Sequence, residues 1–107
     1  MNVQKIPTKI TFFEWLEPSI VSGNKTITIR DKSEMGYVPG TEVDVHTLET
    51  DRKFARIKIV SVEPLWFDDI NEFHAQQEYM ELDKLKALIK EIYPDEMQFY
   101  VITYRLV

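Results

Sequence analysis

Two runs of alternating residues between positions 36 and 65 constrain the fold more than any other part of the sequence. Apolar residues alternate with charged ones in both runs, first at 42–45 and again at 56–59. A period of two predicts strands that bury one face. Pro39 and Gly40 form a turn signal before the first run, and residues 49–53 connect the two. The sequence therefore predicts a β-hairpin in the middle of the chain.

The flanking segments add further strands and at least two helices. The final residues, MQFYVITYRLV at 97–107, are rich in aromatic and β-branched residues, as strands are. Helices are expected at about 68–79 and 82–92, the second ending before Pro94. Another helical pattern precedes Gly23, with a break or a helix start near Pro18. We predict a single domain over residues 1–107, mainly β with inserted helices (α+β), in which the C-terminal strand closes a small β-barrel.

Composition excludes several classes of function. The chain has 107 residues and no cysteine, which excludes disulfides, thiolate zinc sites and a cysteine nucleophile. No segment resembles a signal peptide or reaches the roughly 20 apolar residues of a membrane span, so we expect a cytoplasmic protein without a membrane partner. The three glycines form no phosphate-binding loop.

A net charge of −5 favours a small or weakly charged ligand over a long nucleic acid. A local basic cluster could still contact a polyanion. Its members are Arg52, Lys53, Arg56 and Lys58.

The stretch GNKTITIRD, residues 23–31, is the first candidate site. Its alternation predicts a half-buried strand that carries Lys25, Thr28 and Arg30. These side chains belong either to a solvated strand face or to a polar pocket, and the pattern favours the solvated face. Lys25 and Thr28 are three residues apart and would point to opposite faces of a regular strand. They converge only if Lys25 lies in the turn after Gly23 or if the strand bends.

Glu78 is the second candidate, because helical spacing aligns it with Ile70 and His74. If that helix face packs towards the mouth of the predicted barrel, Glu78 becomes a partly buried carboxylate with a raised pKa suited to acid catalysis. An ordinary exposed glutamate is the simpler interpretation of the sequence alone. The pair His74 and Glu78 could bind a metal ion, but two ligands are a weak metal-site pattern, and we expect no metal and no cofactor.

The motif GNKTITIR resembles that of the ASCH domain, a PUA-like β-barrel family whose pattern is Gly, any, Lys, two residues, usually Glu, any, Arg. Gly23, Lys25 and Arg30 match, whereas Thr28 stands where most relatives carry glutamate. The threonine at this position and the segments ITFFEWL, FHAQQEYM and IYPDEMQFYVITY are similar to those of one branch of the family. That branch is the small bacterial N(4)-acetylcytidine amidohydrolases. The resemblance covers about residues 10–104.

The resemblance implies a hydrolase that converts N(4)-acetylcytidine to cytidine and acetate. It implies Lys25 as the proton acceptor, Thr28 as the nucleophile and Glu78 as the proton donor, with Arg30 in a supporting, substrate-binding role. The alternative is a non-catalytic PUA-like module that binds RNA or a modified nucleoside, which the acidic charge disfavours. The partner is then a small modified nucleoside, and the sequence does not indicate an oligomeric state.

These roles set electrostatic requirements. A lysine acts as a base only when neutral, so its pKa must fall from about 10.4 towards neutrality. Burial and the Arg30 cation would lower that pKa, while an ionised Glu78 would raise it, so a neutral Lys25 beside a protonated Glu78 suits the reaction.

Two details of the pocket stay open in the sequence. Either Arg30 or a backbone N–H of the 23–25 turn could bind the oxyanion. Side chains that could form the wall for the cytosine ring are Phe12, Trp66, Phe99 and Tyr100.

Overall fold

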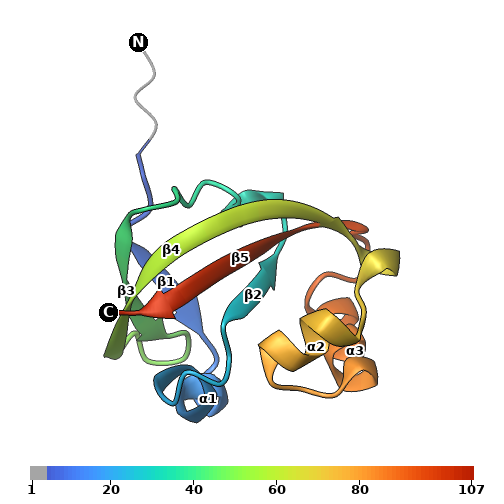
Figure 1. Cartoon of the computed structure of the whole chain (residues 1–107), viewed down its shortest axis with the longest axis horizontal. Helices are drawn as coiled ribbons and strands as arrows, with labels where there is room; N and C mark the ends of the chain where they lie inside the picture. Colours follow the sequence, from blue (N-terminus) through green and yellow to red (C-terminus); the bar gives the residue numbers. More distant parts are fainter. Residues whose placement is uncertain (1–4) are drawn as a thin grey trace.

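The computed structural model describes residues 5–107, which fold around one five-stranded sheet with the strand order β1-β3-β4-β5-β2 (Figure 1). The strands are β1 (Lys9–Phe12), β2 (Ile27–Arg30), β3 (Glu42–Thr47), β4 (Lys53–Trp66) and β5 (Gln98–Leu106). The α-helices are α1 (Glu17–Val21), α2 (Glu72–Glu78) and α3 (Leu82–Ile92). Short 3-10 helices are η1 (Glu14–Leu16), η2 (Lys32–Glu34) and η3 (Phe67–Asp69). The structure is the mixed α+β fold that the sequence predicts.

The predicted hairpin is confirmed as β3 and β4, which pair antiparallel across the turn at residues 48–52. β4 is 14 residues long and extends beyond the part that pairs with β3. It pairs with β5 over most of its length. The register shifts between Ile59 and Ser61, and a bulge of this kind bends a strand pair. Figure 1 shows β4 and β5 curving together over the other elements.

The edges of the sheet differ from the prediction. β5 does not close the sheet but lies inside it, antiparallel to β4 on one side and to β2 on the other. The sequence predicts no strand at Lys9–Phe12, yet β1 pairs there in parallel with β3. The nine-residue β5 can pair along both edges, while the four-residue strands β1 and β2 leave little unpaired backbone at the outside.

The second predicted helix is confirmed as α3, but the first is shorter than expected. α2 begins at Glu72, because Asn71 has an extended backbone and its side chain accepts the N–H of Phe73 at 2.9 Å, as an N-cap does. Residues 67–69 form a separate 3-10 turn. Near the N-terminus, η1 passes into α1 with Pro18 in its first turn, as the proline predicts.

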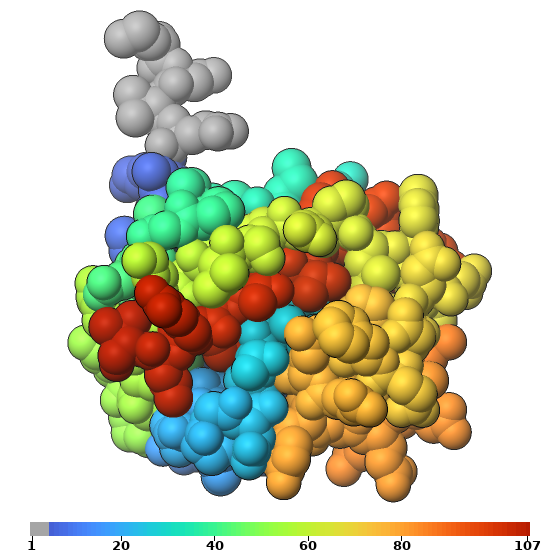
Figure 2. Space-filling model, in the orientation of Figure 1, coloured from blue at the N-terminus to red at the C-terminus, as the bar shows by residue number. Residues whose placement is uncertain are grey.

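β2 is buried on both faces, which corrects the half-buried strand of the sequence prediction. Ile27, Thr28 and Ile29 are all buried. Ile29 packs with Phe99 in a core cluster that includes residues of α2 and α3. Figure 2 shows α1 and the chain leading into β2, in blue, packed against the orange α2–α3 layer. An edge strand enclosed in this way offers polar side chains to the protein interior.

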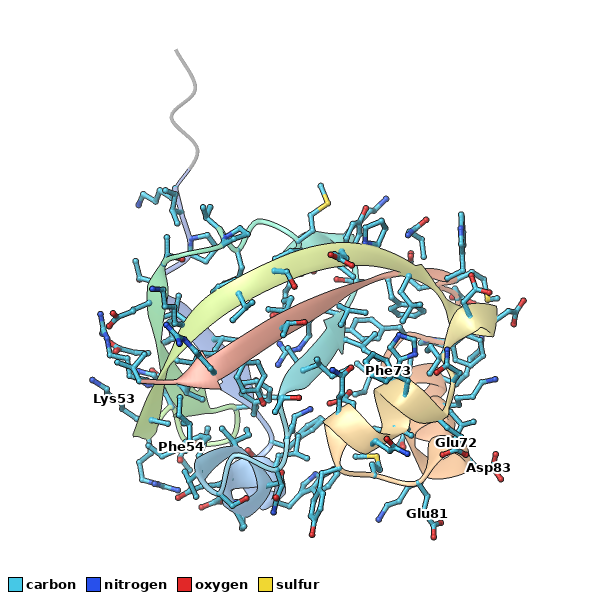
Figure 3. The ribbon with its side chains drawn as sticks, viewed as in Figure 1. Lys53, Phe54, Glu72, Phe73, Glu81 and Asp83 are labelled. Atoms are coloured by element: carbon cyan, nitrogen blue, oxygen red, sulfur yellow. The ribbon has the colours of Figure 1, made fainter. Side chains whose placement is uncertain are left out.

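The outer surface of the α2–α3 layer carries acidic side chains. Glu72, Glu81 and Asp83 lie there, at the opposite end of the molecule from Lys53 and Phe54 (Figure 3). No helix within residues 5–107 is long and apolar enough to cross a membrane.

Candidate active site

A cavity of about 320 Å³ lies where β1 and β2 face α3 and the end of α2. Four of its lining side chains are charged: Lys25, Arg30, Glu34 and Glu78. Thr28 also lines it. The remaining lining residues are uncharged: Thr11, Phe12, Phe13, Leu16, Ile29, Leu48, Met80, Leu85, Leu88, Ile89, Ile92 and Tyr93. All four candidate residues of the sequence, Lys25, Thr28, Arg30 and Glu78, thus reach one cavity.

Lys25 lies in the loop before β2, so the strand rule for opposite faces does not apply to it. Gly23 takes a positive φ of 81° that lets the chain turn after α1, and the N–H of Lys25 donates to the Ser19 carbonyl at 2.9 Å. The side chain then turns inward, and Nζ donates to the Ile27 carbonyl at 2.8 Å. The turn therefore brings Lys25 to the cavity that Thr28 reaches from β2.

Lys25 and Glu78 form a buried pair in direct contact. Nζ of Lys25 contacts Oε1 of Glu78, and their side chains are 3% and 6% exposed. Burial lowers the pKa of Lys25 well below its ordinary value, and the nearby Arg30 cation lowers it further. Lys25 therefore loses its proton more readily than an exposed lysine, as a catalytic base requires.

Glu78 is the last residue of α2, and its side chain contacts Lys25. Tyr79 follows in a left-handed conformation with φ of 56°, which ends the helix there. Ile70 lies outside the helix, so the predicted row with Ile70 and His74 is not a helix face. Nδ1 of His74 accepts the Asn71 N–H at 3.1 Å, so its role is helix capping. Among the residues that the structure describes, no three His, Cys, Asp or Glu side chains form a metal-binding group.

Thr28 and Arg30 form a second polar pair in the cavity. Nε of Arg30 donates to Oγ1 of Thr28 at 2.9 Å, and Nη2 donates to the Thr11 carbonyl of β1 at 2.8 Å. Nη1 donates to Oε1 of Glu34 at 2.6 Å. The guanidinium also stacks on Phe12, 4.8 Å from the ring centroid. Arg30 thereby links the two edge strands and has a fixed orientation beside the Thr28 hydroxyl.

The backbone of the 23–25 turn has no free donor for an oxyanion. The N–H groups of Gly23, Asn24 and Lys25 donate to Ile20 O, Ser22 Oγ and Ser19 O, respectively. Arg30 has five N–H bonds, of which three are used in the contacts above. Of the two donors left open by the sequence, Arg30 is the one with N–H bonds to spare.

One of the four proposed aromatic wall residues, Phe12, lines the cavity. Phe99 is fully buried in the core next to Tyr93, Trp66 is more than half exposed, and Tyr100 does not line the cavity. Sequence reasoning missed Phe13 and Tyr93, which do line it. Phe13 follows Phe12 directly, and Tyr93 lies one helical turn after the buried Ile89. The positions of Phe12 and Ile89 in the sequence could therefore have indicated both residues.

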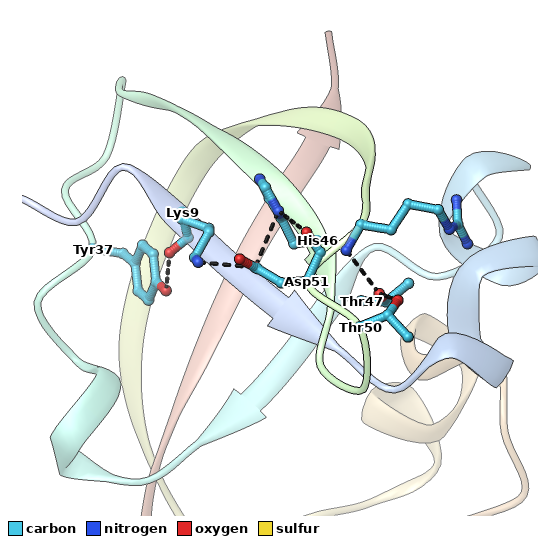
Figure 4. A network of polar contacts seen from close by, with 7 residues as sticks. Lys9, Tyr37, His46, Thr47, Thr50 and Asp51 are labelled. Carbon is cyan, nitrogen blue, oxygen red and sulfur yellow. Dashed lines mark hydrogen bonds and ion pairs between the residues drawn. The ribbon is translucent and has the colours of Figure 1, made fainter.

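A network of polar contacts joins the β3–β4 turn to β1 (Figure 4). Lys9 and His46 both contact Oδ1 of Asp51, at 2.9 and 3.2 Å, which ties the turn to β1. The N–H of Leu48 donates to the Phe12 carbonyl at 2.8 Å. The last residue of β1, Phe12, is therefore held next to Leu48 of the turn, and both line the cavity.

The basic cluster of the sequence is largely neutralised by carboxylates. Arg52 contacts Glu14 and Glu17, Lys53 lies 3.2 Å from Asp44, and Arg56 contacts Glu42 and Asp44. These pairs disfavour the cluster as a polyanion site, since its charges already have partners.

The chain is similar to proteins of known name across most of its length. A Vibrio cholerae serotype O1 protein named N(4)-acetylcytidine amidohydrolase is 67% identical over 101 residues, which cover 94% of this chain and 89% of the relative. A Vibrio campbellii protein of the same name is 68% identical and covers 94% and 95%, respectively. A third, from Vibrio atlanticus, is 58% identical over 94% of this chain and 97% of its own length. No family model matches the chain.

Solved structures resemble the fold at low identity. A protein of Enterococcus faecalis superimposes with a TM-score of 0.76 at 19% identity, over 98% of this chain and 78% of that protein. An ASCH domain from Lactobacillus crispatus gives 0.75 at 12% identity, over 92% and 79%. The fold is therefore that of an ASCH domain, which is PUA-like.

Proposed function

The chain belongs to the family of N(4)-acetylcytidine amidohydrolases, and we propose that it hydrolyses N(4)-acetylcytidine to cytidine and acetate. The observation that carries the proposal is the buried Lys25–Glu78 pair, in the same cavity as the Thr28–Arg30 pair. A base, a hydroxyl nucleophile, an acid and a fixed cation are the groups that amide hydrolysis needs.

In the first step, neutral Lys25 takes the proton of the Thr28 hydroxyl, and Oγ1 of Thr28 attacks the acetyl carbonyl carbon. The carbonyl oxygen becomes an oxyanion, which the free N–H bonds of Arg30 stabilise. Protonated Glu78 gives its proton to the amide nitrogen, the carbon–nitrogen bond breaks, and cytidine leaves. The acetyl group remains as an ester of Thr28.

In the second step, water attacks the ester, and the ionised Glu78 accepts one of the water protons. The carbon–oxygen bond to Thr28 breaks, and Lys25 returns the hydroxyl proton to Oγ1. The product leaves as acetic acid, which carries the second water proton and ionises to acetate in solvent, and the site regains a neutral Lys25 and a protonated Glu78. The pair thus holds one transferable proton before the first step, after it and after the second step, on Glu78 or on Lys25, which is a role suited to a buried lysine and a buried carboxyl group in contact.

Incubation of the purified protein with N(4)-acetylcytidine, followed by mass spectrometry of the nucleoside, tests the proposal. We expect stoichiometric cytidine and acetate without added metal. Retention of RNA with no loss of the acetyl group would instead support the non-catalytic binding module.

Replacing Arg30 with glutamine is expected to change both the rate and its pH dependence. Loss of the oxyanion donor lowers kcat by about 10²- to 10³-fold. The Arg30 cation also lowers the pKa of Lys25, so its removal raises that pKa. A base is active above its pKa, and the rising limb of kcat/KM against pH therefore moves to higher pH in Arg30→Gln.

The matched control is Arg56→Gln, which removes an ion-paired arginine outside the cavity and keeps the wild-type profile. An Arg30→Gln profile that falls in rate but keeps its midpoint would contradict electrostatic control of Lys25 by Arg30.

A further inference from the structure

Glu34 is the one charged residue of the cavity with no part in the chemistry above. It comes from η2, its side chain is 31% exposed, and it is paired with Arg30. We propose that Glu34 is a specificity-determining residue that disfavours anionic substrates, so the cavity accepts the neutral acetylated nucleoside and discriminates against its phosphate esters. This inference rests on the proposed function and names the substrate class of the same site.

The cavity offers no unpaired cation to a phosphate. Its lining contains two basic and two acidic side chains, in the pairs Lys25–Glu78 and Arg30–Glu34. The formal charge of the lining is zero wherever the proton of the buried pair resides. Arg30 is already paired with Glu34 and also contacts Thr28, Thr11 and the Phe12 ring, so a phosphate that used its remaining N–H bonds would lie beside the Glu34 carboxylate.

Glu34 has the most exposed side chain among the charged residues of the cavity lining, at 31% against 12% for Arg30, 3% for Lys25 and 6% for Glu78. Lys25, Thr28 and Glu78 are buried, whereas Leu48 and Ile92 are the exposed residues of the lining. Both exposed residues are apolar, which leaves the half-exposed Glu34 as the charge nearest to solvent. A nucleoside whose amide lies beside the buried Lys25, Thr28 and Glu78 directs its sugar away from them and towards the more exposed lining, since the sugar and the amide occupy opposite sides of the pyrimidine ring.

A 5′-phosphate would therefore lose water beside a carboxylate and apolar side chains. Burial of an unpaired charge is costly, and like charges at short range add repulsion that solvent screens only partly. Neutral sugar hydroxyls carry no such penalty, and the carboxylate of Glu34 can accept a hydrogen bond from them.

The test compares kcat/KM for three substrates: N(4)-acetylcytidine, its 5′-monophosphate and its 5′-O-methyl ether. The wild type is expected to prefer the nucleoside over the monophosphate by at least about tenfold, and to accept the methyl ether nearly as well as the nucleoside. The methyl ether enlarges the 5′ position without adding a charge, so it separates the effect of substrate size on kcat/KM from the effect of substrate charge. Equal rejection of the ether and the phosphate would assign the selectivity to shape and overturn the proposal.

Variants at Glu34 test the charge directly. Glu34→Gln removes the charge with little change of size and is expected to reduce the preference for the nucleoside by about 5- to 10-fold, whereas Glu34→Asp keeps it. The ratio of two substrates is measured within each variant, so a common loss of activity through Arg30 cancels. Glu42→Gln is the matched control, because Glu42 is also paired with an arginine, Arg56, but lies outside the cavity.

An unchanged ratio in Glu34→Gln, or the same change in Glu42→Gln, would overturn the role of Glu34. Failure of the wild type to hydrolyse N(4)-acetylcytidine would overturn the proposed function itself. Turnover of nucleoside and monophosphate at equal rates would overturn this inference alone.

Discussion

Thr28→Val is expected to lower kcat for N(4)-acetylcytidine by at least about 10⁴-fold, because valine has the shape of threonine without the nucleophilic oxygen. Thr28 is buried and lies in the middle of β2, where a β-branched replacement keeps the strand and its packing. Loss of Oγ1 also leaves Nε of Arg30 without its acceptor, which costs about 1–3 kcal/mol in the free energy of unfolding.

Two companion variants separate chemistry from structure. Thr28→Ser keeps a hydroxyl and is expected to retain activity within about 10²-fold of the wild type. Thr103→Val removes a hydroxyl from the neighbouring strand β5, outside the cavity, and is expected to leave kcat unchanged. Near-normal turnover by Thr28→Val would exclude the threonine nucleophile and would favour water activated by Lys25.

Lys25→Met is expected to lower kcat by about 10²- to 10⁴-fold, the usual effect of losing a positioned base. Methionine fills a similar apolar space, and Glu78 avoids an unpaired buried charge by remaining protonated. Lys53→Met is the matched control, since it removes an ion-paired lysine at the protein surface and is expected to be fully active.

The same variant is expected to change the pH dependence of stability. The folded state binds the Lys25 proton more weakly than the unfolded state, because its pKa is lowered from 10.5. Between the lowered pKa and 10.5 the unfolded chain holds a proton that the folded protein has released, so the free energy of unfolding rises with pH. Lys25→Met lacks this rise, and denaturant unfolding at several pH values measures the difference. Parallel curves for the two proteins would show that the pKa of Lys25 is not lowered.

The sequence predicted the secondary structure well where a segment has a strong period of its own. The β3–β4 hairpin, α3 and β5 each carry an unbroken pattern of apolar residues, and all three lie where that pattern places them. β1 was missed because four residues at an edge carry too little alternation to be recognised. The position of β5 inside the sheet depends on long-range pairing with β2 and β4, which a local pattern does not encode.

The candidate site also depends on long-range contacts that a local sequence pattern does not encode. Residue types and the family motif pointed to Lys25, Thr28, Arg30 and Glu78, and all four line one cavity. Nothing in the sequence placed Glu34 there, because its contact with Arg30 depends on the turn that follows β2. The pairing of Lys25 with Glu78 joins residues 53 positions apart and required the packing of α2 against the loop before β2.

The central claim is that Lys25 and Thr28 act as one catalytic unit, and the kcat of the double variant Lys25→Met/Thr28→Val tests it most directly. A base whose only role is to deprotonate the Thr28 hydroxyl has no effect on kcat once that hydroxyl has been removed. We therefore predict that the double variant is no slower than Thr28→Val alone. Losses that multiply, with the double variant slower than Thr28→Val by the full factor that Lys25→Met causes on its own, would contradict the account.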